Sequence, residues 1–212
     1  MIKNLNIHAL KRMRHRINRL YGPQEVEHLL ERMVALIGRY GIGFEGYSAA
    51  ERWSETSAVL ITYGDMVQNG DELPLQVLKR FADRHLSGAV NTVHILPFCP
   101  YSSDDGFSVI DYREVDPNLG SWEDIQNLGR GFRLMFDLVL NHVSRKSTWF
   151  VDYVANIAPY RDFFIEEDPE TDLSAVVRPR NLPLLTPVHT RHGDVHLWTT
   201  FSDDQIDLDF AN

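Results

Sequence analysis

Polar and aromatic side chains gather just after three apolar stretches of the chain. The first stretch ends in Tyr-Gly-Asp at 63–65, the second in a run rich in Asp, Ser and aromatic residues at 97–107, and the third in Asp-Leu-Val-Leu-Asn-His at 137–142. Carboxylate, amide and imidazole groups hydrogen-bond the hydroxyls of a sugar, and aromatic rings stack on the C–H faces of its ring. Together the three stretches favour a carbohydrate site.

Each of these residues also has a structural interpretation when it is taken alone. Asp104-Asp105-Gly106 is a turn signal, Asp137 suits a helix cap, and His142 suits a hydrogen-bonded core histidine. Only their convergence at one edge of a fold distinguishes a binding site from these alternatives.

The three apolar stretches have the composition of buried strands, at 58–63, 92–98 and 132–140. Apolar residues at helical spacing over 73–86 and a Ser-x-x-Asp capping signal at 121–124 predict helices between them. Strands that alternate with helices predict a parallel sheet, whose strands all present their carboxyl ends at one rim. The polar residues that follow the strands are therefore expected to meet there.

The alternation does not extend over the whole chain. Amphipathic spacing predicts a helix over 23–40 and a shorter one over 148–155, whereas 159–185 is rich in proline and has no clear periodicity. Three parallel strands cannot close an eight-stranded barrel and would leave one edge without a partner. We therefore expect the sequence to be part of a longer chain.

Glycines at 41–46 match the G-x-G-x-x-G pattern of dinucleotide-binding turns. That turn needs a strand before it and a helix N-terminus after it to hold the pyrophosphate, but here a helix precedes the glycines. We interpret them as a helix stop and a loop, followed by a Ser-x-x-Glu capping signal at 48–51.

Composition and charge exclude several classes of protein. The chain has 212 residues, of which 43% are hydrophobic and 24% charged, as in globular rather than disordered proteins. Its single cysteine, Cys99, cannot form an internal disulfide, which suits a reducing cytoplasm. Residues 1–20 carry six basic and no acidic side chains, interpreted as a solvated helix, and the other 192 residues carry a net charge of −15. Such an acidic body argues against nucleic acid as a partner, and the chain has no apolar run of membrane-spanning length.

Taken together, the motifs resemble the α-amylase superfamily of retaining α-glycoside enzymes. Asp-x-Val-x-Asn-His at 137–142 is similar to its first signature region. The resemblance covers about residues 20–212 and is closest to the sucrose phosphorylase branch; within that branch, the helical extension and the stretch 182–187 are most similar to glucosylglycerate phosphorylases. Further matching motifs are Asp-Asp-Gly-Phe at 104–107, Asp-Tyr at 111–112, Gly-Ser-Trp at 120–122, Arg-Pro-Arg at 178–180, Trp-Thr-Thr-Phe at 198–201 and Asp-Gln-x-Asp-Leu at 204–208.

The resemblance implies an α/β fold: the N-terminal part of a (β/α)8 barrel, about three βα units, with the beginning of a loop-rich B domain inserted after the third strand. It assigns residues 1–56 to a helical extension, 57–157 to the barrel and 158–212 to the start of domain B. In this family the nucleophilic aspartate follows the fourth strand and the acid/base glutamate follows the fifth. No catalytic residue is therefore expected in this chain, because both carboxyl groups would lie beyond Asn212.

Five residues match positions that bind substrate in the family. By resemblance, Asp104 and His142 hydrogen-bond the hydroxyls of the glucose that is cleaved, and Phe107 packs against it as an aromatic wall. Gln205 matches a glutamine that borders the acceptor site, and Arg180 matches an arginine that contacts phosphate or an acidic group of the acceptor. A guanidinium suits such oxyanions because it donates two parallel hydrogen bonds. A surface salt bridge is the alternative interpretation of Arg180.

No cofactor and no metal ion are expected. Asn141 matches a position that ligates structural calcium in many amylases, but the phosphorylase branch generally lacks that ion. His189, His192 and His196 have a spacing that invites zinc, and we interpret them as part of a polar loop. Four aspartates are assigned to a loop and a strand of domain B: Asp203, Asp204, Asp207 and Asp209.

The predicted function is that of a retaining α-glucoside phosphorylase of the glucosylglycerate or sucrose type, which transfers glucose to phosphate through a glucosyl-aspartate intermediate. An α-glucosidase or transglucosylase of the same superfamily and an inactive sugar-binding remnant are the alternatives. The expected partners are an α-glucoside and inorganic phosphate, in the cytoplasm and without nucleic acid or membrane. The 212 residues by themselves are expected to be inactive.

Overall fold

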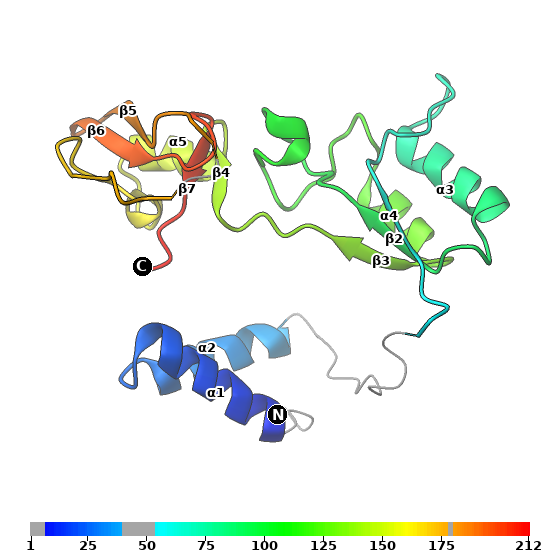
Figure 1. The fold of residues 1–212 in the computed structure, drawn as a ribbon, viewed down its shortest axis with the longest axis horizontal. Coiled ribbons are helices and arrows are strands. Elements are labelled where there is room, and N and C mark those ends of the chain that lie inside the picture. The colour runs from blue at the N-terminus through cyan, green and yellow to red at the C-terminus, as the bar shows by residue number, and fades with distance from the viewer. Residues whose placement is uncertain (1–6, 40–53, 178–179) are drawn as a thin grey trace. The chain divides into compact units, whose positions relative to one another are not determined.

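A computed structural model describes residues 7–39, 54–177 and 180–212, which are drawn as ribbons in Figure 1. The chain divides into two compact units, Met1–Glu55 and Thr56–Asn212. The predicted glycine loop at 41–46, the capping signal at 48–51 and Arg178 lie outside the described residues.

The first unit contains two helices, α1 (Ile7–Tyr21) and α2 (Val26–Arg39). They pack through a small apolar core of Ile17, Val26 and Leu30. Helix α2 confirms the amphipathic helix predicted over 23–40. Most basic side chains of α1 are exposed, as expected for a solvated helix.

Three parallel strands in the order β1-β2-β3 open the second unit. The backbone register aligns Val59 with Thr92 and Thr92 with Arg133, so the carboxyl ends of the strands lie at one edge, as predicted. The strands and the helices between them are β1 (Val59–Thr62), α3 (Pro74–His85), β2 (Thr92–Ile95), α4 (Trp122–Gly129) and β3 (Arg133–Phe136).

Helices α3 and α4 cover one face of this sheet (Figure 1). The core between them contains Leu75 and Leu78 of α3, Ile95 of β2 and Leu128 of α4, all of which are buried. Helix α4 begins with the predicted capping box, in which the Asp124 backbone N–H donates to Ser121 Oγ and the Ser121 backbone N–H donates to Asp124 Oδ2. The α/β architecture expected from the sequence is therefore present in detail.

The third strand is shorter than predicted. Pairing with β2 ends at Phe136 rather than Leu140, and Leu138 and Leu140 are 72% and 52% exposed. Residues 137–140 leave the sheet as an extended connection. The Tyr112 hydroxyl donates a hydrogen bond to the Val139 carbonyl in this connection over 2.7 Å. Apolar composition predicts an extended backbone but does not tell a paired strand from an extended connection.

A second group of elements follows this connection, built around antiparallel pairs β4–β7 and β5–β6. Its core contains Val143, Phe150, Tyr153, Leu197 and Ile206, all buried. The buried residues of this core run from Val143 to Ile206, with Tyr112 packed against them. The predicted domain boundary between 157 and 158 stays a prediction. The elements are β4 (His142–Ser144), α5 (Thr148–Val154), β5 (Leu185–Thr190), β6 (Gly193–Trp198) and β7 (Gln205–Asp207), with short 3-10 turns η2 (Asp104–Gly106) and η3 (Tyr160–Asp162).

The three histidines at 189–196 do not form the polar loop that we predicted. His189 lies in β5 and His196 in β6, while His192 occupies the tight turn between these strands. Strand β6 begins at Gly193, which pairs with Thr190 across the turn. None of the described helices is long and apolar enough to cross a membrane.

Candidate functional site

The turn η2, which lies beyond the end of β2, has an unusual backbone. Asp104 and Asp105 both have positive φ angles, 56° and 48°, which are unfavourable for residues other than glycine. Gly106 has a φ of 99°, and a Cβ atom there would lie 2.6 Å from the Pro97 carbonyl oxygen. The sequence signal for a turn is thus confirmed, and the turn holds Asp104 and Phe107 in a conformation that surrounding contacts must maintain.

Strands β4 and β7 bring two of the predicted site residues together. His142 begins β4, Gln205 begins β7, and the antiparallel register places both in one ladder. Gln205 is fully buried, and His142 is only 5% exposed. The Gln205 side chain donates from Nε2 to Asp104 Oδ2 over 3.0 Å, and its Oε1 accepts from the Ser202 hydroxyl at 2.8 Å. The buried amide therefore joins the β4–β7 pair to the turn.

Both ring nitrogens of His142 have hydrogen-bonding neighbours. His142 Nε2 lies 2.9 Å from the Phe107 carbonyl oxygen, which can only accept. Nδ1 lies 3.5 Å from Asn141 Nδ2, which can only donate. His142 Nε2 also lies 3.1 Å from Gln205 Nε2, a second group that can only donate, so the imidazole links Phe107 to Gln205. Burial lowers the pKa of His142 and so favours a neutral ring, although the hydrogen bond to Phe107 acts in the opposite direction.

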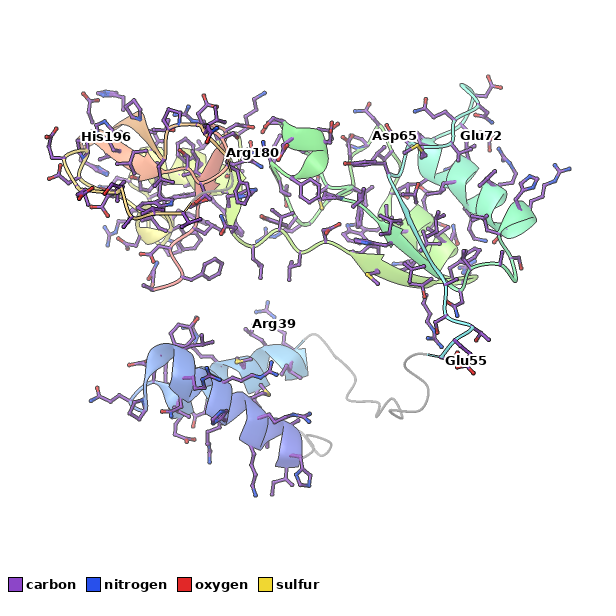
Figure 2. All side chains as sticks on the ribbon, in the orientation of Figure 1. Arg39, Glu55, Asp65, Glu72, Arg180 and His196 are labelled. Carbon is purple, nitrogen blue, oxygen red and sulfur yellow. The ribbon has the colours of Figure 1, made fainter. Side chains whose placement is uncertain are left out.

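Arg180 completes the set of five predicted residues (Figure 2). Its Nη2 lies 3.3 Å from Asp104 Oδ1 and 3.4 Å from Oδ2, and its guanidinium carbon lies 6.0 Å from the centre of the Phe201 ring. Arg180 thus forms a salt bridge, as its alternative interpretation has it, with a candidate site residue, and its contact with phosphate or an acidic acceptor group stays a prediction. Asp104, Phe107, His142, Gln205 and Arg180 form one continuous network.

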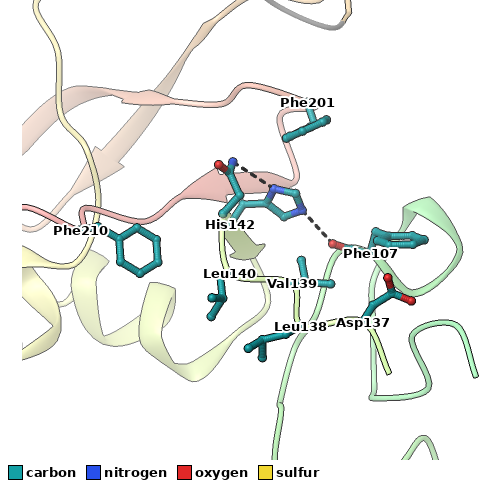
Figure 3. A pocket seen from close by; sticks show the side chains of 9 residues that line it. Phe107, Asp137, Leu138, Val139, Leu140, His142, Phe201 and Phe210 are labelled. Atoms are coloured by element: carbon teal, nitrogen blue, oxygen red, sulfur yellow. Dashed lines mark hydrogen bonds between the residues drawn. The ribbon is translucent and has the colours of Figure 1, made fainter. Parts of the chain in front are cut away.

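An open pocket of about 540 Å³ lies beside this network (Figure 3). Figure 3 shows the rings of Phe107, Phe201 and Phe210 around His142, and the Phe201 ring meets the imidazole edge-on with centroids 5.1 Å apart. The pocket is lined by Phe107, Asp137, Leu138, Val139, Leu140, Asn141, His142, Phe201 and Phe210.

Phe201 and Asp137 line the pocket but were not among the five predicted site residues. Phe201 belongs to a recognised motif, but nothing local shows that a phenylalanine in a polar loop faces a histidine 59 positions earlier. Asp137 does not cap a helix, as the structural alternative had it, and instead lies 2.8 Å from His94 of β2. Only the parallel register of β2 and β3 could have indicated this pairing.

The polar end of the first strand does not line the same pocket. Tyr63 and Asp65 line a neighbouring pocket, also of about 540 Å³, together with Tyr101 and Asp105. Burial and the nearby carboxylates, above all that of Asp105, raise the pKa of Tyr63. Asp105 therefore lines this second pocket, whereas the adjacent Asp104 contacts Gln205 and Arg180 beside the first.

The cation candidates from the sequence have other partners. Asn141 Nδ2 donates to Asp207 Oδ1 over 2.9 Å, and burial raises the pKa of Asp207 despite hydrogen bonds from Thr200. His189 lies 2.6 Å from Asp194 on the exposed hairpin. Among the residues that the structure describes, no group of three or more His, Cys, Asp or Glu side chains is arranged to hold a metal ion.

Parallel strands joined by helices, with a pocket near their carboxyl ends, are the architecture of a (β/α)8-barrel protein. The alpha amylase catalytic domain matches residues 88–211, more than half of the chain. The chain belongs to the α-amylase family, and the resemblance noted in its motifs is thereby confirmed.

The curated relatives are similar to the chain over most of its length. The glucosylglycerate phosphorylase of Escherichia coli is 54% identical over 163 residues, which cover 76% of this chain and 29% of that protein. The sucrose phosphorylase of Streptococcus mutans is 35% identical over 162 residues, which cover 71% and 33%. The chain spans about a third of the length of the curated relatives it matches.

Among solved structures, sucrose 6F-phosphate phosphorylase from Thermoanaerobacter thermosaccharolyticum aligns with a TM-score of 0.68 and 30% identity. The alignment covers 78% of this chain and 36% of that one. The fold of βα units expected from the sequence is therefore that of solved enzymes of the same branch.

Proposed function

We propose that this chain supplies the glucose-binding side of a retaining α-glucoside phosphorylase, which transfers glucose to inorganic phosphate. The observation that carries the proposal is the network in which Gln205 and Arg180 both contact the Asp104 carboxylate while His142 contacts the Phe107 carbonyl. Two members of this network, Phe107 and His142, line the pocket, and the network supports the proposal because it holds a carboxylate and a cation beside them.

In this proposal Asp104 and His142 bind hydroxyls of the glucosyl group. A carboxylate accepts hydrogen bonds strongly, and a neutral imidazole held by a carbonyl keeps its orientation without adding a charge. Phe107 supplies an apolar face for the C–H side of the ring, as first expected, and Phe201 supplies a second. Gln205 borders the site and fixes the Asp104 carboxylate.

Arg180 is the residue that favours phosphate over water as the second substrate. Its side chain is 46% exposed and its charge is offset only in part, by an Asp104 carboxylate at 3.3 Å. A guanidinium that can turn from this carboxylate toward a phosphate binds it through two parallel hydrogen bonds. In the glucosyl transfer the aspartate first displaces the acceptor, whose oxygen takes a proton from the acid/base glutamate, and a phosphate oxygen then displaces the aspartate; the two inversions retain the configuration. The proposal places this aspartate and the acid/base glutamate beyond Asn212.

We take glucosylglycerate as the first donor to test, because the relative with that name is 54% identical to the chain and the sucrose phosphorylase is 35% identical. An acidic acceptor group also suits the cationic Arg180. The proposal places the reaction in the cytoplasm, whose reducing conditions suit the single cysteine.

The test is phosphorolysis by the complete protein as its source makes it. With glucosylglycerate and phosphate we expect α-glucose 1-phosphate, and without phosphate almost no release of glucose. Arg180→Ala is expected to raise the KM for phosphate by about tenfold or more, the effect of losing a charge-assisted hydrogen bond. Arg191→Ala removes an exposed arginine at the β5–β6 turn and serves as the matched control.

Two results would contradict the proposal. Release of glucose at the same rate with and without phosphate would identify a hydrolase of the same family. Absence of any turnover by the complete protein would favour the inactive sugar-binding remnant.

A further inference from the structure

Asp204 precedes Gln205 in the chain, but its carboxylate contacts a different group of residues. Asp204 Oδ2 accepts hydrogen bonds from three serine hydroxyls of the 102–108 loop, which contains the turn η2. Ser103 Oγ lies 2.5 Å and Ser108 Oγ 2.8 Å from this oxygen, and Ser102 is the third donor. One carboxylate therefore holds both ends of the loop that carries Asp104 and Phe107.

The same network reaches strand β4. Ser144 Oγ lies 2.5 Å from Ser102 Oγ, and the Ser144 backbone N–H donates to the Val109 carbonyl over 2.9 Å. Since each hydroxyl carries one proton, Ser144 donates to Ser102, and Ser102 donates to Asp204. Ser108 and Ser144 are both fully buried. The hydroxyl chain thus joins the 102–108 loop to β4, two residues beyond His142.

The backbone around Asp204 adds a further contact between the same segments. Its carbonyl oxygen accepts from the Arg145 backbone N–H at 3.1 Å. The residue therefore connects the loop, the end of β4 and the start of β7. These three segments carry Asp104, His142 and Gln205, respectively.

The 102–108 loop needs such external contacts. Asp104 and Asp105 have positive φ angles, and strained backbones of this kind persist only where the surroundings over-determine them. Within the loop, the backbone bonds from Ser102 N–H to the Ser108 carbonyl and from Phe107 N–H to the Asp104 carbonyl close the turn. They do not connect it to β4 or β7, whereas the Asp204 carboxylate does.

We propose that Asp204 is a positioning residue for the glucose site: its carboxylate holds the 102–108 loop against β4 and β7, so that Asp104 and Phe107 meet His142 and Gln205. This inference rests on the proposed function, because the residues it positions are those assigned to glucose binding. Asp204 itself does not line the pocket beside His142.

The ionisation of Asp204 agrees with this role. Burial opposes its charge, but the hydrogen bonds from Ser102, Ser103 and Ser108 outweigh that effect, so the pKa of Asp204 lies below its ordinary value. At neutral pH the carboxylate is therefore charged and accepts from all three hydroxyls, which an uncharged amide in its place does less well.

The test compares Asp204→Asn with Asp203→Asn in the complete protein. The two variants remove the same charge from adjacent positions, and Asp203 is exposed. Amide hydrogen exchange of residues 102–108 reports on the loop without any ligand. We expect exchange to be about tenfold faster or more in Asp204→Asn and unchanged in Asp203→Asn.

The second measurement is a double-mutant cycle on the affinity for D-glucose. In the wild-type background Asp104→Asn is expected to weaken binding by about tenfold or more. In the Asp204→Asn background the same change is expected to weaken glucose binding by less than about threefold, because a loop that is no longer held in place does not present Asp104 to the ligand. If Asp204 only stabilised the fold, Asp104→Asn would weaken glucose binding equally in both backgrounds.

The outcomes separate this inference from the proposed function. Two results would overturn the positioning role: unchanged amide exchange of the loop in Asp204→Asn, or losses of glucose affinity from the two substitutions that are independent of each other. In either case, weaker glucose binding by Asp104→Asn in the wild-type background would still support the proposed function. A wild-type protein that does not bind glucose would overturn both. Faster loop exchange together with a reduced cost of Asp104→Asn would support the inference.

Discussion

The side-chain amide of Gln205 lies 3.0 Å from the carboxylate of Asp104, although the two residues are 101 positions apart in the chain. Because Gln205 is fully buried, removing its side chain leaves Asp104 Oδ2 without this hydrogen-bond donor. We expect Gln205→Ala to cost about 1–3 kcal/mol in the free energy of unfolding, measured by urea denaturation.

Gln205→Glu keeps the size of the side chain but replaces the amide that donates to Asp104 with a second carboxylate. At pH 7 two carboxylates would face each other at Asp104, and we expect weaker glucose binding than in Gln205→Ala. Acidification that protonates one of the pair should then restore part of the affinity. Equal affinities for the Ala and Glu variants at pH 7 would contradict the contact.

The lowered pKa of His142 predicts how the free energy of unfolding depends on pH. Burial places its folded pKa below the ordinary 6.5, with Asp207 and Asp104 opposing that shift and Arg180 adding to it. The unfolded chain therefore binds more protons in the window just below pH 6.5, so stability is present above that pH and is lost as the pH falls through the window. His142→Gln should flatten this part of the stability curve in urea titrations. His189→Gln, at an exposed position, should leave it as in the wild type.

Gly106 is predicted to be irreplaceable for a reason beyond its φ angle. Gly106→Ala places a Cβ atom 2.6 Å from the Pro97 carbonyl oxygen, whereas Gly70→Ala has a similar positive φ of 83° and no atom within 4 Å. We expect Gly70→Ala to cost about 1 kcal/mol and Gly106→Ala clearly more, about 2–4 kcal/mol. Equal losses in thermal or urea unfolding would show that the clash is relieved without cost.

Cys99 is predicted to be a slow thiol. Burial, with a contribution from Asp111, raises the pKa of Cys99 to about 11, so the reactive thiolate is scarce at pH 8. A chromogenic disulfide reagent should label the native protein about a hundredfold more slowly than the urea-unfolded chain. Similar rates in the two states would mean that the thiol is accessible and unperturbed.

The sequence alone predicted the parts of the fold that follow from local patterns. Runs of apolar and β-branched residues located β1 and β2, and Ser121 with Asp124 located the start of α4. The five candidate site residues were predicted through motifs. Asp104 and Phe107 follow the parallel strand β2, whereas the antiparallel pair β4–β7 holds His142 and Gln205. Motif resemblance, rather than periodicity, assigned Arg180 and Gln205.

Long-range relationships escaped the sequence analysis. Asp204 was assigned only to a loop or strand of domain B, and its hydrogen bonds to serines about a hundred positions earlier were not foreseen. No local pattern encodes such a contact, because it depends on how β4 and β7 pair. The β5–β6 hairpin was missed because its strands contain polar histidines and a proline, which obscure the alternation typical of strands.

The central claim is that the network around Asp104 binds a glucosyl group, and the most direct test compares two adjacent carboxylates. Asp104 and Asp105 both have positive φ angles, which asparagine tolerates, but only Asp104 contacts Gln205 and Arg180, whereas Asp105 lines the neighbouring pocket. Calorimetric titration of D-glucose into the complete protein should show about tenfold weaker binding or more in Asp104→Asn and wild-type binding in Asp105→Asn. Wild-type affinity in Asp104→Asn, or an equal loss in both variants, would contradict the account.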